Sequence, residues 1–252
     1  MSDLSSNLIV ARDLTIGYGE KAVLEHVNFE VRRGEVFGIL GASGSGKSTL
    51  LKHLIGLYQP ISGEVLISGE NLVNAEGDDR LRILRKFGVL YQGGALFGSL
   101  TTVENVRLPL DEFTQLSETA KDFIALSKLR LVGLAAAATK LPADLSGGMQ
   151  KRAGIARAIV MDPCILFLDE PSAGLDPITS AELDALIREL ARGLGMTFVI
   201  VTHELASIFS VADRVIMLDP NTKSIVAEGA PSELRDHASQ LWVRQFLNRR
   251  VE

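Results

Sequence analysis

The chain has 252 residues, of which 23% are charged and 46% hydrophobic, and its formal net charge is −5. This length accommodates one large α/β domain or two small ones, and the acidic balance argues against a general nucleic-acid-binding protein. The apolar runs are far shorter than the roughly 20 residues that a bilayer-spanning helix needs, and the N-terminus lacks the pattern of a signal peptide. We therefore expect a cytoplasmic protein that binds no nucleic acid and reaches a membrane only through a partner.

The N-terminal part of the chain predicts an antiparallel sheet. Residues 8–19, 22–35 and 63–72 alternate apolar and polar side chains, and turn residues lie between these segments. Such alternation is typical of strands that are half exposed in an antiparallel arrangement.

Four short apolar runs predict a second sheet, and they cover residues 36–40, 87–91, 164–169 and 197–203. Near-continuous apolar runs are typical of parallel strands that are covered on both faces. Between the last two runs, Pro177 suits the start of a helix. After it, apolar residues recur at helical spacing, namely Leu183, Leu186, Ile187, Leu190 and Leu194. Strand, helix and strand in this order predict a right-handed crossover in a parallel sheet.

From about residue 93 to 158 the strand signal disappears and a helical pattern takes over, interrupted by Pro109 and Pro142. We interpret this segment as a helical insertion in an α/β core, because nothing marks it as a separately folding domain. The whole chain is then one domain, with a core of residues 8–92 and 159–230, an insertion of 93–158 and a helical tail of 231–252.

The segment GASGSGKST is a complete G-x-x-x-x-G-K-[ST] match between a buried strand and a helical pattern, which is the context of a true P-loop. Its glycines allow backbone N–H groups to surround phosphate oxygens, and the helix N-terminus adds its dipole. Lys47 is expected to reach the β- and γ-phosphates, and the hydroxyl of Ser48 to hold Mg²⁺. A chance Gly/Ser-rich turn is the disfavoured alternative. The predicted phosphate-binding residues are Gly41, Ala42, Ser43, Gly44, Ser45, Gly46, Lys47, Ser48 and Thr49.

Two consecutive carboxylates end the apolar run 164–169. Asp169 can bind Mg²⁺ directly or through water, and Glu170 is placed to act as the general base for an attacking water. A mere turn or helix cap is the alternative, which the P-loop in the same chain disfavours. Together these residues predict a nucleoside triphosphatase.

The segment LSGGMQKR, residues 145–152, predicts a second anion site, because Ser146, Gly147 and Gly148 stand at the start of a helix. With it, residues 8–230 resemble the ABC ATPase family (ATP-binding cassette). The motifs that carry the resemblance are GASGSGKST, LSGGMQ, ILFLDEP, SAGLD and VTHE. The resemblance implies an α/β P-loop fold of the ABC type, ATP and Mg²⁺ as cofactors, and a homodimer in which this signature closes on the γ-phosphate held by the other subunit.

The resemblance implies four further roles. Tyr18 looks like the aromatic residue that stacks on adenine, although a strand aromatic in the core is a serious alternative. Asp176 resembles the residue that links the two composite sites, and it can also cap the next helix. His203 resembles the histidine that contacts the γ-phosphate and orients the water with Glu170. Gln92 resembles the glutamine that binds Mg²⁺ and the attacking water.

In transporter ATPases, the insertion after this glutamine receives a cytoplasmic helix of the membrane subunit. The resemblance thus implies a multi-span permease that docks near Gln92–Leu100 and holds the chain, as a peripheral subunit, at the cytoplasmic face of the inner membrane. Leu96, Phe97 and Leu100 form an apolar cluster in that segment. For Leu96 and Leu100, packing on the insertion's own core is an equally good interpretation.

Among transporters, the chain resembles the Mla-type (maintenance of lipid asymmetry) and wider MCE-associated ATPases. The motifs are QGGALFGSLTTVENVRLPL, LSGGMQKRAGIARAI, SAGLDPIT and VRQFLNRR, while Gly93-Gly94-Ala95 replaces the family's usual Ser-Gly-Ala. This resemblance implies hydrolysis of ATP to ADP and phosphate coupled to phospholipid transport, with an MCE-domain lipid-binding subunit as a further partner. The alternatives are the ATPase of a polar amino-acid-type importer and a soluble ABC ATPase without a transport role.

The C-terminal segment LWVRQFLNRR carries a short apolar stripe of Leu241, Trp242 and Phe246. This stripe can pack on the chain's own core or against a second copy. Our hypothesis is that it packs against the second copy and supports the dimer.

Overall fold

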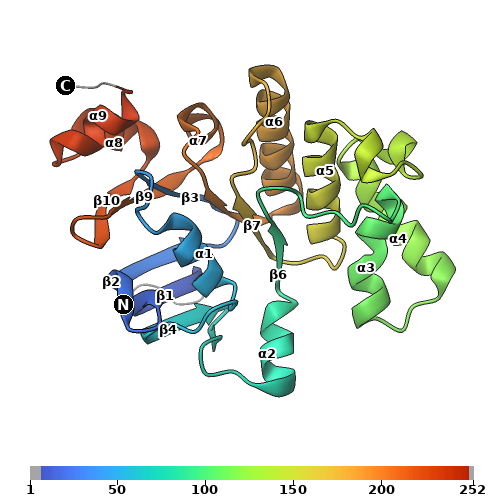
Figure 1. Cartoon of the computed structure of the whole chain (residues 1–252), viewed down its shortest axis with the longest axis horizontal. Coiled ribbons are helices and arrows are strands. Elements are labelled where there is room, and N and C mark those ends of the chain that lie inside the picture. Colours follow the sequence, from blue (N-terminus) through green and yellow to red (C-terminus); the bar gives the residue numbers. More distant parts are fainter. Residues whose placement is uncertain (1–6, 250–252) are drawn as a thin grey trace.

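The computed structural model describes residues 7–249, whose strands form two sheets (Figure 1). The smaller sheet is antiparallel throughout, as predicted for the N-terminal part of the chain. Its strands, in spatial order, are β2 (Lys21–Arg32), β1 (Asn7–Tyr18), β4 (Ser62–Ile67) and β5 (Glu70–Asn71). No helix of residues 7–249 is both long enough and apolar enough to cross a membrane.

The larger sheet is parallel except for one edge strand, so the predicted mostly parallel core is confirmed. Its order is β10 (Ser224–Gly229), β9 (Arg214–Asp219), β3 (Val36–Gly41), β8 (Thr197–Val201), β7 (Ile165–Asp169) and β6 (Phe87–Leu90). The four predicted apolar runs are β3, β6, β7 and β8. Neither β9 nor β10 was predicted, although residues 215–218 of β9 form an apolar run as continuous as the other four.

Helix α1 (Lys47–Leu54) fills the space between the two sheets. Its Leu50, Leu51 and Leu54 share one buried cluster with side chains of β1, β3, β4 and β7. This packing fixes the start of α1 at the end of β3, which is where the P-loop lies. Helix α2 (Gly77–Leu84) follows the smaller sheet and precedes β6.

The segment between β6 and β7 contains helices, which lie together at one end of the molecule (Figure 1). They are α3 (Thr102–Phe113), α4 (Glu118–Leu131), the short η1 (Ala135–Ala137) and η2 (Pro142–Asp144), and α5 (Gly147–Ala158). With α6 (Pro177–Leu194) they cover one face of the larger sheet. Pro142 begins a separate short helix, but the predicted interruption at Pro109 is wrong, because this proline lies inside α3. A proline costs a helix one backbone hydrogen bond, and a capping box at Thr101 and Glu104 supports the start of this one.

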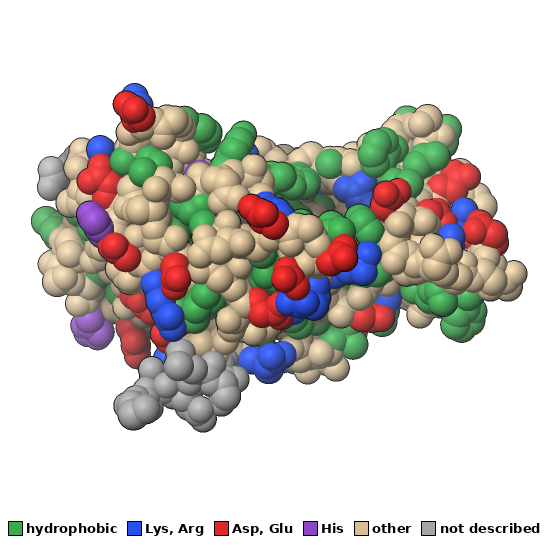
Figure 2. Space-filling model, turned by 90° about the horizontal axis from the view of Figure 1, so that it is seen from below, with side chains coloured by type: hydrophobic (Ala, Val, Ile, Leu, Met, Phe, Trp, Pro, Cys, Tyr) green, Lys and Arg blue, Asp and Glu red, His purple; other side chains and the backbone are tan. Residues whose placement is uncertain are grey.

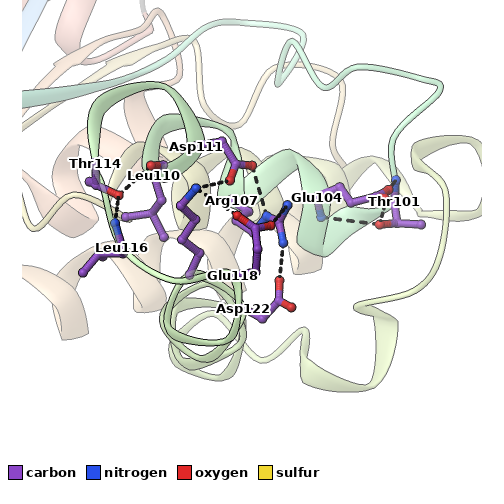
Figure 3. A network of polar contacts seen from close by, with 10 residues as sticks. Thr101, Glu104, Arg107, Leu110, Asp111, Thr114, Leu116, Glu118 and Asp122 are labelled. Atoms are coloured by element: carbon purple, nitrogen blue, oxygen red, sulfur yellow. Dashed lines mark hydrogen bonds and ion pairs between the residues drawn. The ribbon is translucent and has the colours of Figure 1, made fainter.

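A network of ion pairs joins α3 to α4 (Figure 3). The guanidinium of Arg107 contacts Asp111 at 3.0 Å on its own helix, and Glu118 at 3.0 Å and Asp122 at 2.7 Å on α4. Lys121 contacts Asp111 and Glu118 from the other side. These ion pairs fix α4 to α3, and α3 in turn packs on α5.

Helix α5 packs directly against β6 at two glycines. A Cβ atom on Gly88 of β6 would collide with the carbonyl oxygen of Ala158, and a Cβ atom on Gly154 of α5 would collide with Leu90. Gly88 therefore lets the backbone of α5 approach the edge strand directly, and Gly154 leaves room for the side chain of Leu90.

The C-terminal part packs on the chain's own core, as the alternative interpretation of the tail predicted, while its packing against a second copy stays a prediction. Helices α7 (Leu205–Val211), α8 (Pro231–His237) and α9 (Leu241–Leu247) enclose a third apolar cluster beside β3 and β9. Val243 and Leu247 of α9 are buried in it, and Trp242 and Phe246 pack against it. Only Leu241 of the predicted stripe is mostly exposed, at 54%.

Candidate functional site

A cavity of about 1170 Å³ lies at the carboxyl end of β3, which is where ligands bind in open parallel sheets. All nine predicted P-loop residues, from Gly41 to Thr49, line it. Tyr18 and Val23 border it from the smaller sheet. The remaining lining residues are Glu170, His203, Glu204, Leu205, Phe246 and Arg249.

The P-loop adopts a conformation that requires its glycines. Gly44 and Gly46 have φ angles of 77° and 92°, which residues with a Cβ atom rarely adopt. Gly46 is also the N-cap of α1, so the first N–H groups of that helix have no partner within it. These donors and the helix dipole suit the binding of phosphate.

The ammonium of Lys47 folds back over the loop, where Nζ donates to the carbonyl oxygens of Gly41 at 2.9 Å and Ala42 at 3.0 Å. Burial lowers its pKa, while the charges of Glu170 and Asp169 raise it. Lys47 thus stands at the cavity wall as a half-buried cation with weak partners, which a phosphate oxygen can replace.

Ser48 and Asp169 meet beside the P-loop, with Ser48 Oγ 3.5 Å from Asp169 Oδ1. Burial, and then the neighbouring charge of Glu170, raise the pKa of Asp169. Within residues 7–249, no group of three or more His, Cys, Asp or Glu could hold a metal ion unaided. One hydroxyl and one carboxylate next to a phosphate loop fit Mg²⁺, which usually keeps water and substrate phosphates as its other ligands. Gln92 is exposed on the loop after β6 and does not line the cavity.

The carboxylate of Glu170 is held by the residues that follow β8. Its Oε1 lies 2.8 Å from Nδ1 of His203, and its Oε2 accepts from Thr202 Oγ1 at 3.0 Å and from the His203 backbone N–H at 3.4 Å. Glu170 itself has a φ of 48°, in the left-handed region, and such strain is typical of functional positions. The structure therefore brings two of the four predicted catalytic side chains, Glu170 and His203, together at the cavity.

Tyr18 is not a core residue, so that alternative is wrong. Its side chain is 51% exposed, and its hydroxyl lies 3.2 Å from Thr49 Oγ1 at the start of α1. The ring of Tyr58 stands edge-on to it at 5.8 Å. An exposed aromatic ring at the cavity border can stack on a flat base.

Besides Gln92 and Asp169, four predicted site residues do not line the cavity, namely Ser146, Gly147, Gly148 and Asp176. Ser146 is exposed at the start of α5, where its Oγ accepts from Met149 N at 3.3 Å. Asp176 caps α6, as predicted, by accepting from the backbone N–H groups of Ile178 and Thr179. The hydroxyl of Thr179 is the main cause of the lowered pKa of Asp176.

The loop after β6 is shaped by a buried asparagine. Asn105 is fully buried, and its side chain bonds both the N–H and the carbonyl of Phe97, at 2.7 and 3.0 Å. Phe97 remains 58% exposed, whereas Leu96 packs on the core beneath it, as its alternative interpretation predicted.

Three residues of this region were not predicted as site residues. Lys151, inside LSGGMQKR, is buried and reaches the loops after β6 and β7; its position inside a functional motif was the available signal. Phe246 and Arg249 come to the cavity from the tail. No local sequence motif predicts that Phe246 and Arg249 line the cavity, because only the packing of α9 on the core brings them there.

The known proteins that resemble this chain are ATP-binding proteins of transport systems. The model of the ABC transporter family matches residues 24–173. The chain is 40% identical to the intermembrane phospholipid transport system ATP-binding protein MlaF of Escherichia coli K12, over 98% of this chain and 91% of that protein. It is 36% identical to MlaF of Haemophilus influenzae, over 97% and 91%. It is 42% identical to the probable ribonucleotide transport ATP-binding protein mkl of Mycobacterium leprae, over 96% and 69%.

Solved structures agree with the sequence relatives. A dimeric structure of the ATP-binding cassette MJ0796 in a post-hydrolysis state, bound to ADP and Pi, matches with a TM-score of 0.79 and 33% identity, over 88% of this chain and 98% of that one. The structure of cbiO1 from Clostridium perfringens, part of the ABC transporter complex cbiONQ, matches with a TM-score of 0.84 and 28% identity, over 92% of each chain.

Proposed function

Because this chain belongs to the ABC transporter family, we propose that it is the ATP-hydrolysing subunit of a membrane transporter whose cargo is phospholipid. The observation that carries the ATPase part is the meeting of a complete P-loop with the Glu170–His203 pair at one cavity. A phosphate-binding loop alone serves many nucleotide-binding proteins, whereas a carboxylate poised beside it supplies the base for hydrolysis.

ATP enters with its adenine on the exposed ring of Tyr18 and its phosphates on the P-loop. The N–H groups at the start of α1 and the ammonium of Lys47 bind the phosphate oxygens. Ser48 and Asp169 would hold Mg²⁺, and Gln92 is the proposed further ligand. When bound, Mg²⁺ neutralises charge on the phosphates.

Glu170 accepts a proton from the attacking water. Thr202 and His203 hold its carboxylate in place, and because an ionised carboxylate only accepts hydrogen bonds, Nδ1 of His203 carries a proton in this pair. His203 is 61% exposed toward solvent, so its ring can turn from Glu170 to the γ-phosphate.

Two copies of the chain form the complete site. Ser146, Gly147, Gly148 and Asp176 lie away from the cavity of their own chain, and the related cassette MJ0796 is a dimer in its ADP- and Pi-bound structure. In the proposed homodimer, the N–H groups at the start of α5 face the γ-phosphate held by the partner, and Asp176 lies at the contact between the two sites.

A complementation experiment tests this arrangement. K47A and S146A are each expected to abolish most ATPase activity. A mixed dimer of the two contains one doubly defective site and one intact site, so mixing them should restore activity. If the mixture stays as inactive as its components while both variants are folded and exchange subunits, Ser146 does not act across the dimer. Full activity in a strictly monomeric preparation would also contradict the proposal.

The permease docks beside the loop after β6 and holds the chain at the cytoplasmic face of the inner membrane. Phe97 is exposed there, and a groove of about 250 Å³ lies between α2, β6, α3 and α5. Its apolar lining includes Leu81, Leu84, Phe87, Pro109, Phe113 and Met161. Hydrophobic side chains stand between acidic and basic ones on the face that contains α2 (Figure 2). An apolar groove with a charged rim suits the short amphipathic helix of a membrane subunit.

The phospholipid cargo rests on the MlaF relatives, which align with almost the whole chain. A membrane-anchored MCE-domain subunit is the corresponding lipid carrier. The test is reconstitution with the cognate permease in liposomes, combined with deletion of the gene. Stimulation of the ATPase by the anchored lipid carrier, and an envelope that leaks to detergents, are expected. Stimulation only by a soluble amino-acid-binding protein or by ribonucleotides, with an intact envelope, would refute the cargo and leave the ATPase in place.

A further inference from the structure

Lys151 of α5 is a buried cation that the roles assigned above do not use. Its side chain is 5% exposed, and lysines are rarely buried to this degree unless they are paired. Its Nζ donates to the carbonyl oxygen of Gln92 and, at 3.4 Å, to that of Glu170. Burial lowers the pKa of Lys151, while the charges of Asp169 and Glu170 raise it.

The two carbonyl groups mark the level at which two neighbouring strands separate. β6 and β7 pair in parallel up to Leu90 and Leu168, and Gln92 and Glu170 each stand two residues further along the chain. Their backbone positions are therefore opposite each other just beyond the end of the strand pairing. The ammonium of Lys151 joins the two loops at this level.

We propose that Lys151 is a positioning residue for ATP hydrolysis, because its ammonium fixes the backbones of Gln92 and Glu170 relative to each other. The side chains of these two residues must approach the same water from different loops. A bridge between their main chains sets that spacing without touching the water or the nucleotide. The inference rests on the proposed roles of Gln92 and Glu170 in hydrolysis.

Arg157, a second cation of α5, provides a comparison within the same helix. It donates to the carbonyl oxygens of Gly94 at 3.0 Å and Ala95 at 2.8 Å. Both partners belong to the loop after β6, whereas Lys151 also reaches the loop after β7. Loss of Arg157 should therefore loosen one loop, and loss of Lys151 should loosen two.

The bridge also connects the two sites of the proposed dimer. Helix α5 begins at Ser146, which faces the nucleotide of the partner, and Lys151 lies just over one turn further along the same helix. Lys151 thus attaches the helix that serves one site to the backbone of Glu170, the proposed base of the other site. The cooperativity of ATP hydrolysis between the two sites should therefore decrease when the Lys151 contact is removed.

The test compares K151M and K151R in the full chain. Methionine keeps the length of the side chain but has no donor, while arginine can donate to both carbonyls. The matched control is K128M, because Lys128 is also largely buried and pairs with Asp162 on the surface, away from the cavity. K151M should lower kcat by about 10-fold to 100-fold, with KM for ATP and the Kd of a fluorescent ATP analogue within about twofold. K151R should restore most of kcat.

Hydrogen exchange provides a readout besides activity. K151M should speed exchange at residues 91–95 and 170–173 together, whereas R157M should affect only the first segment. A wild-type kcat in K151M overturns the proposal. So does a loss of ATP binding that equals the loss of kcat, accompanied by a lower melting temperature that K151R does not restore.

A double-mutant cycle separates this proposal from the proposed function. If Lys151 acts through Glu170, K151M in the E170Q background should cause little further loss of kcat. A further loss of about tenfold in that background would show that Lys151 acts elsewhere. If E170Q alone hydrolyses ATP at the wild-type rate, the assignment of the base has failed, and that result is independent of K151M.

Discussion

Nδ1 of His203 lies 2.8 Å from Oε1 of Glu170, so that one hydrogen bond joins the loop after β8 to the loop after β7. The imidazole and the carboxylate come from strands that are neighbours in the larger sheet, and Thr202 holds the second oxygen of the same carboxylate. The proposed base is thus held in place by hydrogen bonds from the loop after β8.

Replacing Glu170 by Gln should keep these contacts but remove the group that accepts the proton of the water. We expect E170Q to bind ATP with nearly wild-type affinity, to lose about 10²-fold to 10⁴-fold in kcat, and to accumulate as an ATP-bound dimer on size exclusion. E182Q is the control, because Glu182 pairs with Arg152 on the surface. Near-normal hydrolysis by E170Q would mean that another group is the base.

Asn105→Ala tests the loop proposed to receive the permease. The Asn105 side chain satisfies backbone groups of Phe97, Leu100 and Thr101, and each buried group left unpaired costs about 1–3 kcal/mol. The loop should become mobile, so permease-stimulated hydrolysis should fall while the basal rate changes little. Equal stimulation of variant and wild type by the reconstituted permease would place the docking surface elsewhere.

The tail can be tested by comparing two leucines of α9. Leu247 is 3% exposed and Leu241 is 54% exposed. L247A should lower the free energy of unfolding by about 2–5 kcal/mol, and L241A by less than about 0.5 kcal/mol, as measured by urea denaturation. If L247A leaves the free energy of unfolding unchanged but weakens the dimer, the tail serves the second copy after all.

His53 predicts how stability depends on pH. Burial lowers its pKa below the ordinary value, and its Nδ1 lies 2.8 Å from the carbonyl oxygen of Thr49. Between the folded pKa and the ordinary value, the unfolded chain binds a proton that the folded chain does not, so stability falls as the pH decreases through that window. H53N, which keeps a donor but does not titrate, should lose less stability between pH 7 and pH 5 than the wild type. H237N, at an exposed histidine, is the control, and equal pH profiles for H53N and wild type would contradict the prediction.

Local sequence patterns were sufficient to predict the smaller sheet, four of the six strands of the larger sheet and the P-loop, because strand alternation, buried apolar runs and a glycine-rich turn act over a few residues. The Glu170–His203 pair required the resemblance to a known family, since 33 residues separate the two side chains along the chain. Lys151 and Arg249 could not be placed in this way. The position of Lys151 depends on how closely α5 packs on β6, and that of Arg249 on the packing of α9 in cis. Pro109 lies inside α3 and not at an interruption, because the capping box and the tertiary contacts of this helix compensate for the hydrogen bond that a proline removes.

The close approach of α5 to β6 limits which amino-acid substitutions the protein tolerates at Gly88 and Gly154. Every amino acid that a single base change can make from a glycine codon carries a Cβ atom, and a Cβ atom at Gly88 or Gly154 collides with the neighbouring element. Such overpacking of a close contact typically costs about 1–3 kcal/mol. Each single-base missense change at these two codons is therefore expected to lower the free energy of unfolding. The two positions should consequently vary far less among descendants of this gene than the exposed residues of the tail.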